Sequence, residues 1–259
     1  MREPATREWG LTAPELSVVV PVHNEVGNVG PLNAEIRAAL CDRVDFEIVF
    51  VDDGSDDGTA EFLAQLASEL PRLMIVRLPK RAGQSAAIAA GVRAARARWV
   101  ATLDGDGQND PADILPMLQR LSEPSALSAS PPLGLITGFR RQRRDRWDKR
   151  IAGRIANSLR SRVLGDGTPD TGCGLKLFDR AAFLALPQFD HMHRYLPALF
   201  LRGGWRVVSV PVNHRVRGSG RSHYGVFDRL WVALIDLPGV WWLLHRPLGS
   251  TIVENSDEP

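Results

Sequence analysis

Leu16-Ser-Val-Val-Val-Pro21 and Phe46-Glu-Ile-Val-Phe-Val-Asp52 are apolar runs of strand length, and turn-forming residues follow each of them. A helix is expected between them, around Pro31 to Leu40, and another after the second run, from about Thr59 to Leu70. Strands that alternate with helices in this order form βαβ units, in which the strands are parallel. The first quarter of the chain therefore predicts an α/β fold.

The same alternation continues further along the chain. Leu73 to Arg77 and Trp99 to Leu103 are two more expected strands, separated by an Ala-rich helix from about Gln84 to Arg98, and Leu135 to Thr137 is a later strand. We therefore expect a mostly parallel central sheet. In such sheets ligands bind at the carboxyl ends of the strands.

Polar clusters follow three of these strands: Pro21-Val-His-Asn-Glu25, Asp52-Asp-Gly-Ser-Asp-Asp-Gly-Thr59 and Asp104-Gly-Asp-Gly-Gln-Asn-Asp110. Carboxylates in the second cluster can accept hydrogen bonds from a base or ribose. Asp104 and Asp106, on either side of a glycine, can face one divalent cation already held by phosphate oxygens. Taken singly, each cluster also fits a turn or a helix cap. Their repetition at successive strand ends favours a functional site.

Composition sets the boundaries of this interpretation. The chain has 259 residues, 44% hydrophobic and 24% charged, as expected for one catalytic domain with an appendage. We expect the domain at residues 14–225, helices at 226–248, and disordered ends at 1–13 and 249–259.

No dinucleotide-binding G-x-G-x-x-G follows the first strand, and no Walker-type phosphate loop is present. Cys41 and Cys173 match no metal or redox spacing, which predicts buried reduced thiols.

The motifs together resemble the family-2 glycosyltransferases, and among them the polyprenyl-phosphate and dolichyl-phosphate sugar transferases. The resemblance rests on the three clusters above and on Asp170-Thr-Gly-Cys-Gly-Leu-Lys176, and it spans about residues 15–225. It implies a nucleotide-sugar-binding GT-A-type fold that uses Mg²⁺ or Mn²⁺. The implied nucleotide-binding residues are Pro21, His23, Glu25, Asp52, Asp53 and Gly83; the implied metal-side residues are Asp104, Asp106 and Gln108; the implied catalytic residues are Asp104, Asp106, Asp170 and Arg217.

A basic segment points to a phosphate-ended acceptor. Arg140 to Arg162 carries ten Lys or Arg against two Asp, whereas the whole chain has a net charge of only +2. On an expected helix from about Trp147 to Leu164, Arg150 and Arg154 lie one turn apart and could converge on one anion. In the resembling transferases, Arg at the positions of Arg140 and Arg154 contacts the acceptor phosphate. Since 29 of the 32 basic residues are Arg, a solvated face is the alternative.

The segment Arg217-Gly-Ser-Gly-Arg-Ser-His-Tyr224 reproduces another pattern of the family. By resemblance it closes over the donor diphosphate and the acceptor phosphate, with Arg217 supplying charge and Ser222 a hydroxyl donor. The family commonly has Lys at the position of His223. The structural alternative is a flexible loop with no catalytic part.

These residues predict an inverting transfer from a nucleotide diphosphate sugar to a polyprenyl phosphate. A phosphate monoester is largely ionised at neutral pH and needs no strong base, so Asp170 would orient the acceptor or an Arg. The alternatives are a soluble family-2 transferase acting on a saccharide or protein hydroxyl, in which Asp170 is the base, and a degenerate nucleotide-sugar-binding scaffold. Nucleic acid is not an expected partner.

The last part of the sequence bears on the membrane. Phe227 to Leu244 is apolar and rich in Trp, but Asp236, Pro238 and Gly239 interrupt it. We expect amphipathic helices, either at the membrane interface or packed on the protein or on a second copy of the chain. Met1 to Ala13 is polar and predicts neither a signal peptide nor an anchor. A cytoplasmic protein, peripherally bound to the inner membrane face, is therefore expected.

Overall fold

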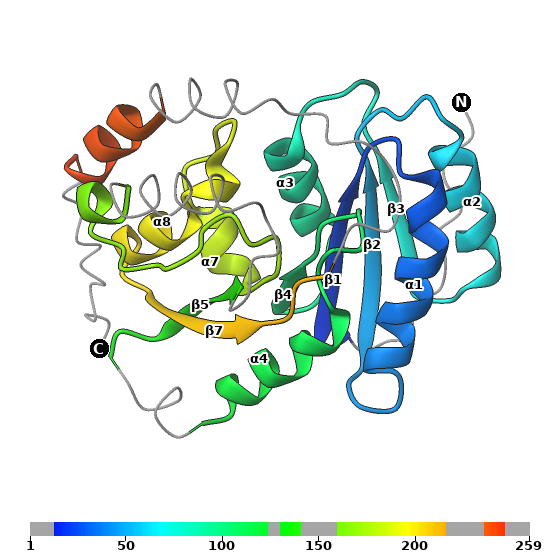
Figure 1. The fold of residues 1–259 in the computed structure, drawn as a ribbon, viewed down its shortest axis with the longest axis horizontal. Helices are drawn as coiled ribbons and strands as arrows, with labels where there is room; N and C mark the ends of the chain where they lie inside the picture. The colour runs from blue at the N-terminus through cyan, green and yellow to red at the C-terminus, as the bar shows by residue number, and fades with distance from the viewer. Residues whose placement is uncertain (1–12, 124–129, 141–159, 216–235, 247–259) are drawn as a thin grey trace, which may run out of the picture.

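The computed structural model describes residues 13–123, 130–140, 160–215 and 236–246. Within them, one seven-stranded sheet has the strand order β3-β2-β1-β4-β6-β5-β7 (Figure 1). All its pairings are parallel except those of β6, which runs antiparallel to β4 and β5. The predicted α/β fold with a mostly parallel sheet is confirmed. The strands are β1 (Leu16–Val22), β2 (Phe46–Asp52), β3 (Leu73–Arg77), β4 (Trp99–Thr102), β5 (Leu133–Arg140), β6 (Lys176–Asp179) and β7 (Arg206–Val212).

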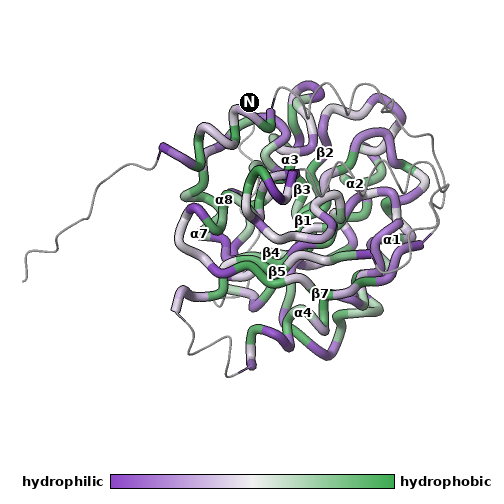
Figure 2. The backbone as a smooth tube through the Cα atoms, turned by 60° about the vertical axis from the view of Figure 1, so that its left-hand side comes forward, coloured by the Kyte–Doolittle hydropathy of each residue, from purple (hydrophilic) through white to green (hydrophobic). Residues whose placement is uncertain are grey.

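Helices cover both faces of this sheet. Val18 and Val20 of β1 belong to a core shared with α1, α2 and α4, whereas Val19 faces the opposite core, shared with α3, α7 and α8. The strands are therefore buried on both sides, and Figure 2 shows hydrophobic segments along them at the centre of the molecule. The helices are α1 (Val26–Leu40), α2 (Thr59–Glu69), α3 (Gln84–Ala94), η1 (Pro111–Asp113), α4 (Ile114–Leu121), α7 (Arg180–Ala185), η2 (Met192–Arg194) and α8 (Leu196–Arg202).

Two predicted helix boundaries were wrong. Helix α1 begins at Val26 and includes Pro31, so it starts about one turn earlier than expected. Helix α3 ends at Ala94 instead of near Arg98. The backbone N–H and the side-chain Nε of Arg96 donate to the buried carboxylate of Glu47, at 2.7 and 3.0 Å. These two bonds hold the chain outside the helix.

The prediction for the cysteines was half right. Cys173 is buried, but Cys41 is exposed. Cys41 is the residue that follows α1, and it lies just beyond the buried Leu40. The apolar stripe of the helix therefore ends one residue before this thiol.

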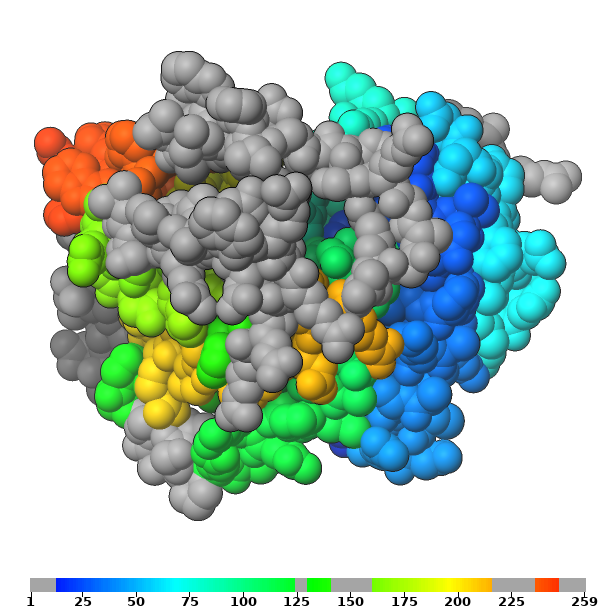
Figure 3. All heavy atoms as spheres, in the orientation of Figure 1, coloured from blue at the N-terminus to red at the C-terminus, as the bar shows by residue number. Residues whose placement is uncertain are grey.

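Residues 236–244 form a helix on the same side of the sheet as α3 and α8. Val240 is buried in that core, while Trp241 and Trp242 are 46% and 58% exposed. The backbone carbonyl of Leu243 accepts a hydrogen bond from Arg202 of α8 at 3.0 Å. In Figure 3 this segment (orange-red) lies at the molecular surface, away from α1 and α2 (blue and cyan). Among the described helices, none is both long and apolar enough to cross a bilayer.

Several predictions fall on residues outside the described ranges. These are the expected disordered ends, apart from residue 13, most of the helix expected at 147–164, and the part of the C-terminal extension before residue 236. Only residues 160–164 of the expected basic helix are described, and they are helical.

Candidate active site

The predicted polar clusters meet at one edge of the sheet. Strands β1, β2 and β4 end there, and so does β5, whose last residue is Arg140. Because β6 is antiparallel to β4 and β5, its first residue, Lys176, lies at this same edge. The topology therefore gathers side chains from the loops after four strands and from the start of a fifth.

The loops that follow β1 and β2 are bonded to each other. His23 Nδ1 lies 2.9 Å from the backbone oxygen of Asp53, and the backbone N–H of Glu25 donates to Thr59 Oγ1 at 3.0 Å. The backbone oxygen of Pro21 packs against Gly105, where an added Cβ would lie only 2.9 Å from it. Pro21 therefore adjoins the loop that carries Asp104 and Asp106, while His23 and Glu25 adjoin the loop after β2.

Asp52 and Asp53 are both buried, and they make different contacts. The carboxylate of Asp53 accepts the backbone N–H groups of Ala82 and Gly83 at 2.6 and 2.9 Å, so it fixes the entry to α3. Asp52 Oδ1 accepts the backbone N–H of Ser55, and its Oδ2 lies 3.5 Å from Nε of the exposed Arg77 in an ion pair. Asp53 is therefore bound to the backbone at the start of α3, whereas Asp52 is bound to its own turn and to Arg77 at the end of β3.

Asp104 is held from two sides. Gln84 Nε2, in the first turn of α3, donates to Asp104 Oδ1 at 2.8 Å, and the backbone N–H of Asp104 donates to Asn109 Oδ1 at 3.1 Å. Burial, followed by the charge of Asp106, raises the pKa of Asp104 from 3.8 to about 6. A cation bound here would stabilise the ionised form of Asp104.

The donor set fits a divalent cation that shares its coordination with phosphate. Asp106 Oδ1 accepts the backbone N–H of Gln108 at 3.1 Å, which fixes this carboxylate within the loop. Within the described ranges, no three His, Cys, Asp or Glu residues gather into a metal site. Two carboxylates alone bind a hard cation incompletely, and Mg²⁺ commonly takes one or two carboxylates together with substrate phosphates.

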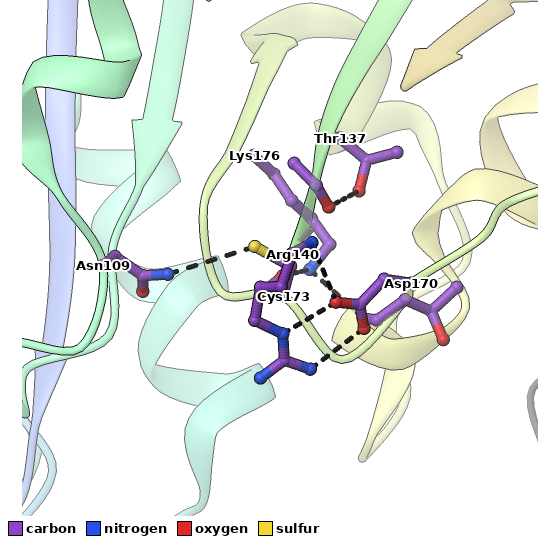
Figure 4. A network of polar contacts seen from close by, with 8 residues as sticks. Asn109, Thr137, Arg140, Asp170, Cys173 and Lys176 are labelled. Carbon is purple, nitrogen blue, oxygen red and sulfur yellow. Dashed lines mark hydrogen bonds and ion pairs between the residues drawn. The ribbon is translucent and has the colours of Figure 1, made fainter. Parts of the chain in front are cut away.

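Arg140 and Asp170 form a bidentate ion pair beside this loop. Arg140 Nε and Nη2 donate to Asp170 Oδ2 and Oδ1 at 2.7 and 2.9 Å, and both side chains are largely buried (Figure 4). Both carboxylate oxygens of Asp170 accept hydrogen bonds from Arg140, so Asp170 orients the guanidinium of Arg140. Arg140 also helps to hold down the pKa of Asp104, so the two groups share one electrostatic environment.

Three contacts of the site were not predicted from the sequence. Gln84 binds Asp104, the buried Lys176 donates to the carbonyls of Thr171 and Cys173, and Gly174 packs against the Asp104 carboxylate. Gln84 is the first residue of α3 and follows Gly83 directly. A polar residue at a helix start that follows a strand is a sequence signal that could have identified Gln84 as a site residue. Arg150, Arg154, Arg217 and Ser222 lie outside the described residues, and their roles remain predictions.

Comparisons with known proteins agree on one class. A family model described as "Glycosyl transferase family 2" matches residues 17–186. The chain is 36% identical over 237 residues to a dodecaprenyl-phosphate galacturonate synthase of Rhizobium johnstonii, covering 89% of this chain and 68% of the relative. It is 35% identical over 215 residues to an undecaprenyl-phosphate 4-deoxy-4-formamido-L-arabinose transferase of Edwardsiella ictaluri, covering 82% and 63%. The chain thus spans about two thirds of the length of these relatives.

Solved structures share the fold. A glucosyl-3-phosphoglycerate synthase from Mycobacterium tuberculosis, in complex with Mn²⁺, UDP and glucosyl-3-phosphoglycerate, has a TM-score of 0.64 at 18% identity, over 91% of this chain and 82% of that one. A mannosyltransferase from Pyrobaculum calidifontis, in complex with GDP-Man and Mn²⁺, has a TM-score of 0.66 at 21% identity, over 93% and 67%. The synthase is also known with Mg²⁺ and UDP, at a TM-score of 0.64 and 18% identity over 91% and 81%. The expected GT-A-type fold is confirmed.

Proposed function

The chain belongs to glycosyl transferase family 2, and we propose that it is an inverting, metal-dependent transferase that moves a sugar from a nucleotide diphosphate sugar to a polyprenyl phosphate. The relatives are named for transfer to dodecaprenyl and undecaprenyl phosphate. The observation that supports this function best is the placement of the Arg140–Asp170 pair beside the acidic pair Asp104 and Asp106. A phosphate acceptor requires a cation next to the diphosphate site, and Arg140 supplies one.

The donor nucleotide would bind along the loops after β1 and β2. Asp52, which ends β2 and pairs with the exposed Arg77, would face the base or ribose, and His23 and Glu25 line the neighbouring loop. Asp53 contributes indirectly, because it fixes Gly83 at the entry to α3. Asp104 and Asp106, with Gln108 nearby, would hold the divalent cation. When bound, that cation neutralises charge on the leaving diphosphate.

The acceptor phosphate would bind at Arg140. Its guanidinium is already oriented by Asp170, so little side-chain freedom is lost when a phosphate arrives. An ionised phosphate oxygen attacks the anomeric carbon, forming the new C–O bond on the face opposite the leaving group. The bond from that carbon to the diphosphate breaks, and its electron pair leaves with the nucleoside diphosphate. The acceptor has a second pKa of about 6, so no protein base is needed at neutral pH.

The test measures transfer from labelled UDP-sugars and GDP-sugars to undecaprenyl phosphate in detergent, with Mn²⁺ or Mg²⁺. We expect Arg140→Ala to raise the KM for the lipid phosphate roughly 10- to 100-fold, because a charge-assisted hydrogen bond contributes about 1.5–3 kcal/mol. The KM for the donor should change less than about twofold. Arg120→Ala is the matched control, since Arg120 lies on α4 in an exposed pair with Glu123.

Three results would contradict the proposal. Transfer to a saccharide or protein hydroxyl, with none to polyprenyl phosphate, would make Asp170 a base and the function a different one. An equal loss of donor affinity in Arg140→Ala would place Arg140 at the diphosphate instead. Nucleotide binding without any transfer would indicate a scaffold.

A membrane-bound acceptor implies that the enzyme works at a bilayer surface. The exposed Trp241 and Trp242, together with Leu201, which is 40% exposed on the adjacent α8, could enter the interfacial layer. We therefore extend the proposal to peripheral attachment through the helix at 236–244.

A further inference from the structure

Lys176 is a buried cation to which the proposed mechanism gives no task. It is the first residue of β6, where its register partners are Thr102 of β4 and Thr137 of β5, and it is only 4% exposed. Its Nζ donates to the backbone oxygens of Cys173 and of Thr171, the latter at 3.4 Å (Figure 4). The ammonium group therefore ties the segment 170–175 back onto the strand that this segment enters.

The segment 170–175 touches both halves of the proposed site. At its start, Asp170 holds Arg140. Near its end, Gly174 lies against Asp104, and a Cβ added there would be 2.1 Å from Asp104 Oδ2. The carbonyl of Gly174 accepts a hydrogen bond from Thr102 Oγ1 at 2.8 Å. A shift of this segment would thus displace the acceptor-side arginine and the metal-side carboxylate together.

Charge explains why a lysine is kept at a place where burial is unfavourable. An ammonium group taken out of water loses hydration, and burial accordingly lowers the pKa of Lys176. The nearby Asp104 and Asp170 charges act in the opposite direction, as does Cys173. An apolar residue could fill the same volume, but it would leave the carbonyls of Thr171 and Cys173 without this donor, and the two carboxylates without this cation.

We propose that Lys176 is a positioning residue that couples the donor and acceptor sides of the active site, by holding segment 170–175 against Asp104 while Asp170 holds Arg140. The names donor side and acceptor side rest on the proposed function. The structural coupling itself can be measured without any substrate.

The first experiment measures amide hydrogen exchange in the full chain. We expect Lys176→Met to accelerate exchange at residues 171–175 by roughly tenfold or more, because the two carbonyls lose their donor. Lys80→Met is the matched control, since Lys80 is the other lysine among the described residues and is exposed. It should leave these amides unchanged.

The second experiment titrates Mn²⁺ with UDP and with GDP into the same variants, by calorimetry below their unfolding temperatures. Lys176→Met should weaken Mn²⁺–nucleotide binding by about tenfold and also raise the KM for undecaprenyl phosphate, whereas Lys80→Met should stay within about twofold of wild type. A residue with a merely structural role would lower the melting temperature and leave both quantities unchanged in the folded protein.

Gly174→Ala provides a second variant that keeps Lys176, in case Lys176→Met does not fold. Its added Cβ presses directly on the Asp104 carboxylate, so it should weaken Mn²⁺–nucleotide binding and raise the KM for the lipid phosphate in the same way. The coupling is overturned if the folded variants match wild type in both exchange and binding. If wild type transfers no sugar to polyprenyl phosphate while Lys176→Met still frees residues 171–175, the proposed function fails and the coupling stands.

Discussion

Asp104 is the acid whose surroundings change its chemistry most. Its pKa, raised from 3.8 to about 6, means that the folded protein keeps a proton that the unfolded chain loses. Between about pH 4 and about pH 6 the free energy of unfolding therefore falls as pH rises, and the loss is complete above about pH 6. At neutral pH the ionised Asp104 thus lowers the stability of the metal-free protein.

Asp104→Asn should remove the loss of stability that the ionised Asp104 causes at neutral pH. Relative to wild type, we expect the variant to be more stable at about pH 7, by on the order of 1–3 kcal/mol, with the difference disappearing near pH 4. The same variant should lose turnover, because a neutral amide binds a divalent cation poorly. Urea unfolding at the two pH values, with a transfer assay at neutral pH, checks both parts. A stability difference that does not change with pH would show that Asp104 is not the titrating group.

At the residue scale, the acids of the site could be predicted because they directly follow strands. Asp52 ends β2, Asp53 follows it, and Asp104 and Asp106 lie in the loop after β4, so parallel pairing alone brings them to one edge. Lys176 could not be predicted in this way. Its place depends on β6 inserting antiparallel between β4 and β5, which is a tertiary pairing that no local pattern specifies.

At the scale of elements, β1 to β4 were predicted closely, β5 was expected shorter than it is, β6 and β7 were not predicted, and two helix ends were wrong. Apolar runs define strands buried on both faces, whereas α3 ends where Arg96 meets Glu47, a residue 49 positions away along the chain. Such a contact leaves no local signal. The same kind of contact holds the loop after β4, because the residues after β7 bind the residues that follow Asp106.

This contact is a clasp formed by Asn213 and Arg215. The backbone N–H and the Nδ2 of Asn213 donate to the two oxygens of the largely buried Asp113, at 2.6 and 3.0 Å. The backbone N–H of Arg215 donates to the carbonyl of Gln108 at 2.9 Å, and its guanidinium pairs with Asp110 at 2.7 Å. The clasp thus fixes the far side of the loop that begins at Asp104.

Breaking the clasp should destabilise the fold in a defined order. Asp113→Ala leaves two donors of Asn213 without their acceptor, so the free energy of unfolding should fall by roughly 1–3 kcal/mol. Asn213→Ala removes only one of the two bonds and should cost less. Glu123→Ala is the control, because it removes one partner of an exposed ion pair, and its effect should stay within about 0.5 kcal/mol. Denaturant unfolding of the three variants measures the order, and equal costs for all three would disprove the clasp.

At the scale of the whole molecule, five of the six exposed large apolar residues in the described part of the chain lie in two distant places, and the sixth is Val163. Val26 and Phe62 lie on α1 and α2, while Leu201, Trp241 and Trp242 lie on α8 and the helix at 236–244. Figure 3 shows these two regions at opposite sides of the molecule. Tryptophan favours the interfacial layer of a bilayer, so the second region is the better candidate for membrane contact.

Attachment there should combine an apolar part with an electrostatic part. Burial of apolar surface contributes roughly 25 cal/mol per Å², so two tryptophans and a leucine supply on the order of several kcal/mol. The basic segment from Arg140 to Arg162 would add attraction to anionic lipid that salt screens. We expect the protein to pellet with anionic vesicles at low salt and to be partly released at high salt.

Substitutions distinguish specific membrane binding through the helix at 236–244 from non-specific binding to vesicles. Trp241→Ser combined with Trp242→Ser should abolish most vesicle binding at either salt concentration, with little change in stability, because Val240 keeps the helix packed on the core. Phe62→Ser on α2 should bind vesicles like wild type. If full-length protein stays in the supernatant at every ionic strength, the helix at 236–244 serves packing or oligomer contact. Transfer to polyprenyl phosphate would then not depend on binding of the enzyme to a membrane. The assay with detergent-solubilised acceptor would still detect that transfer.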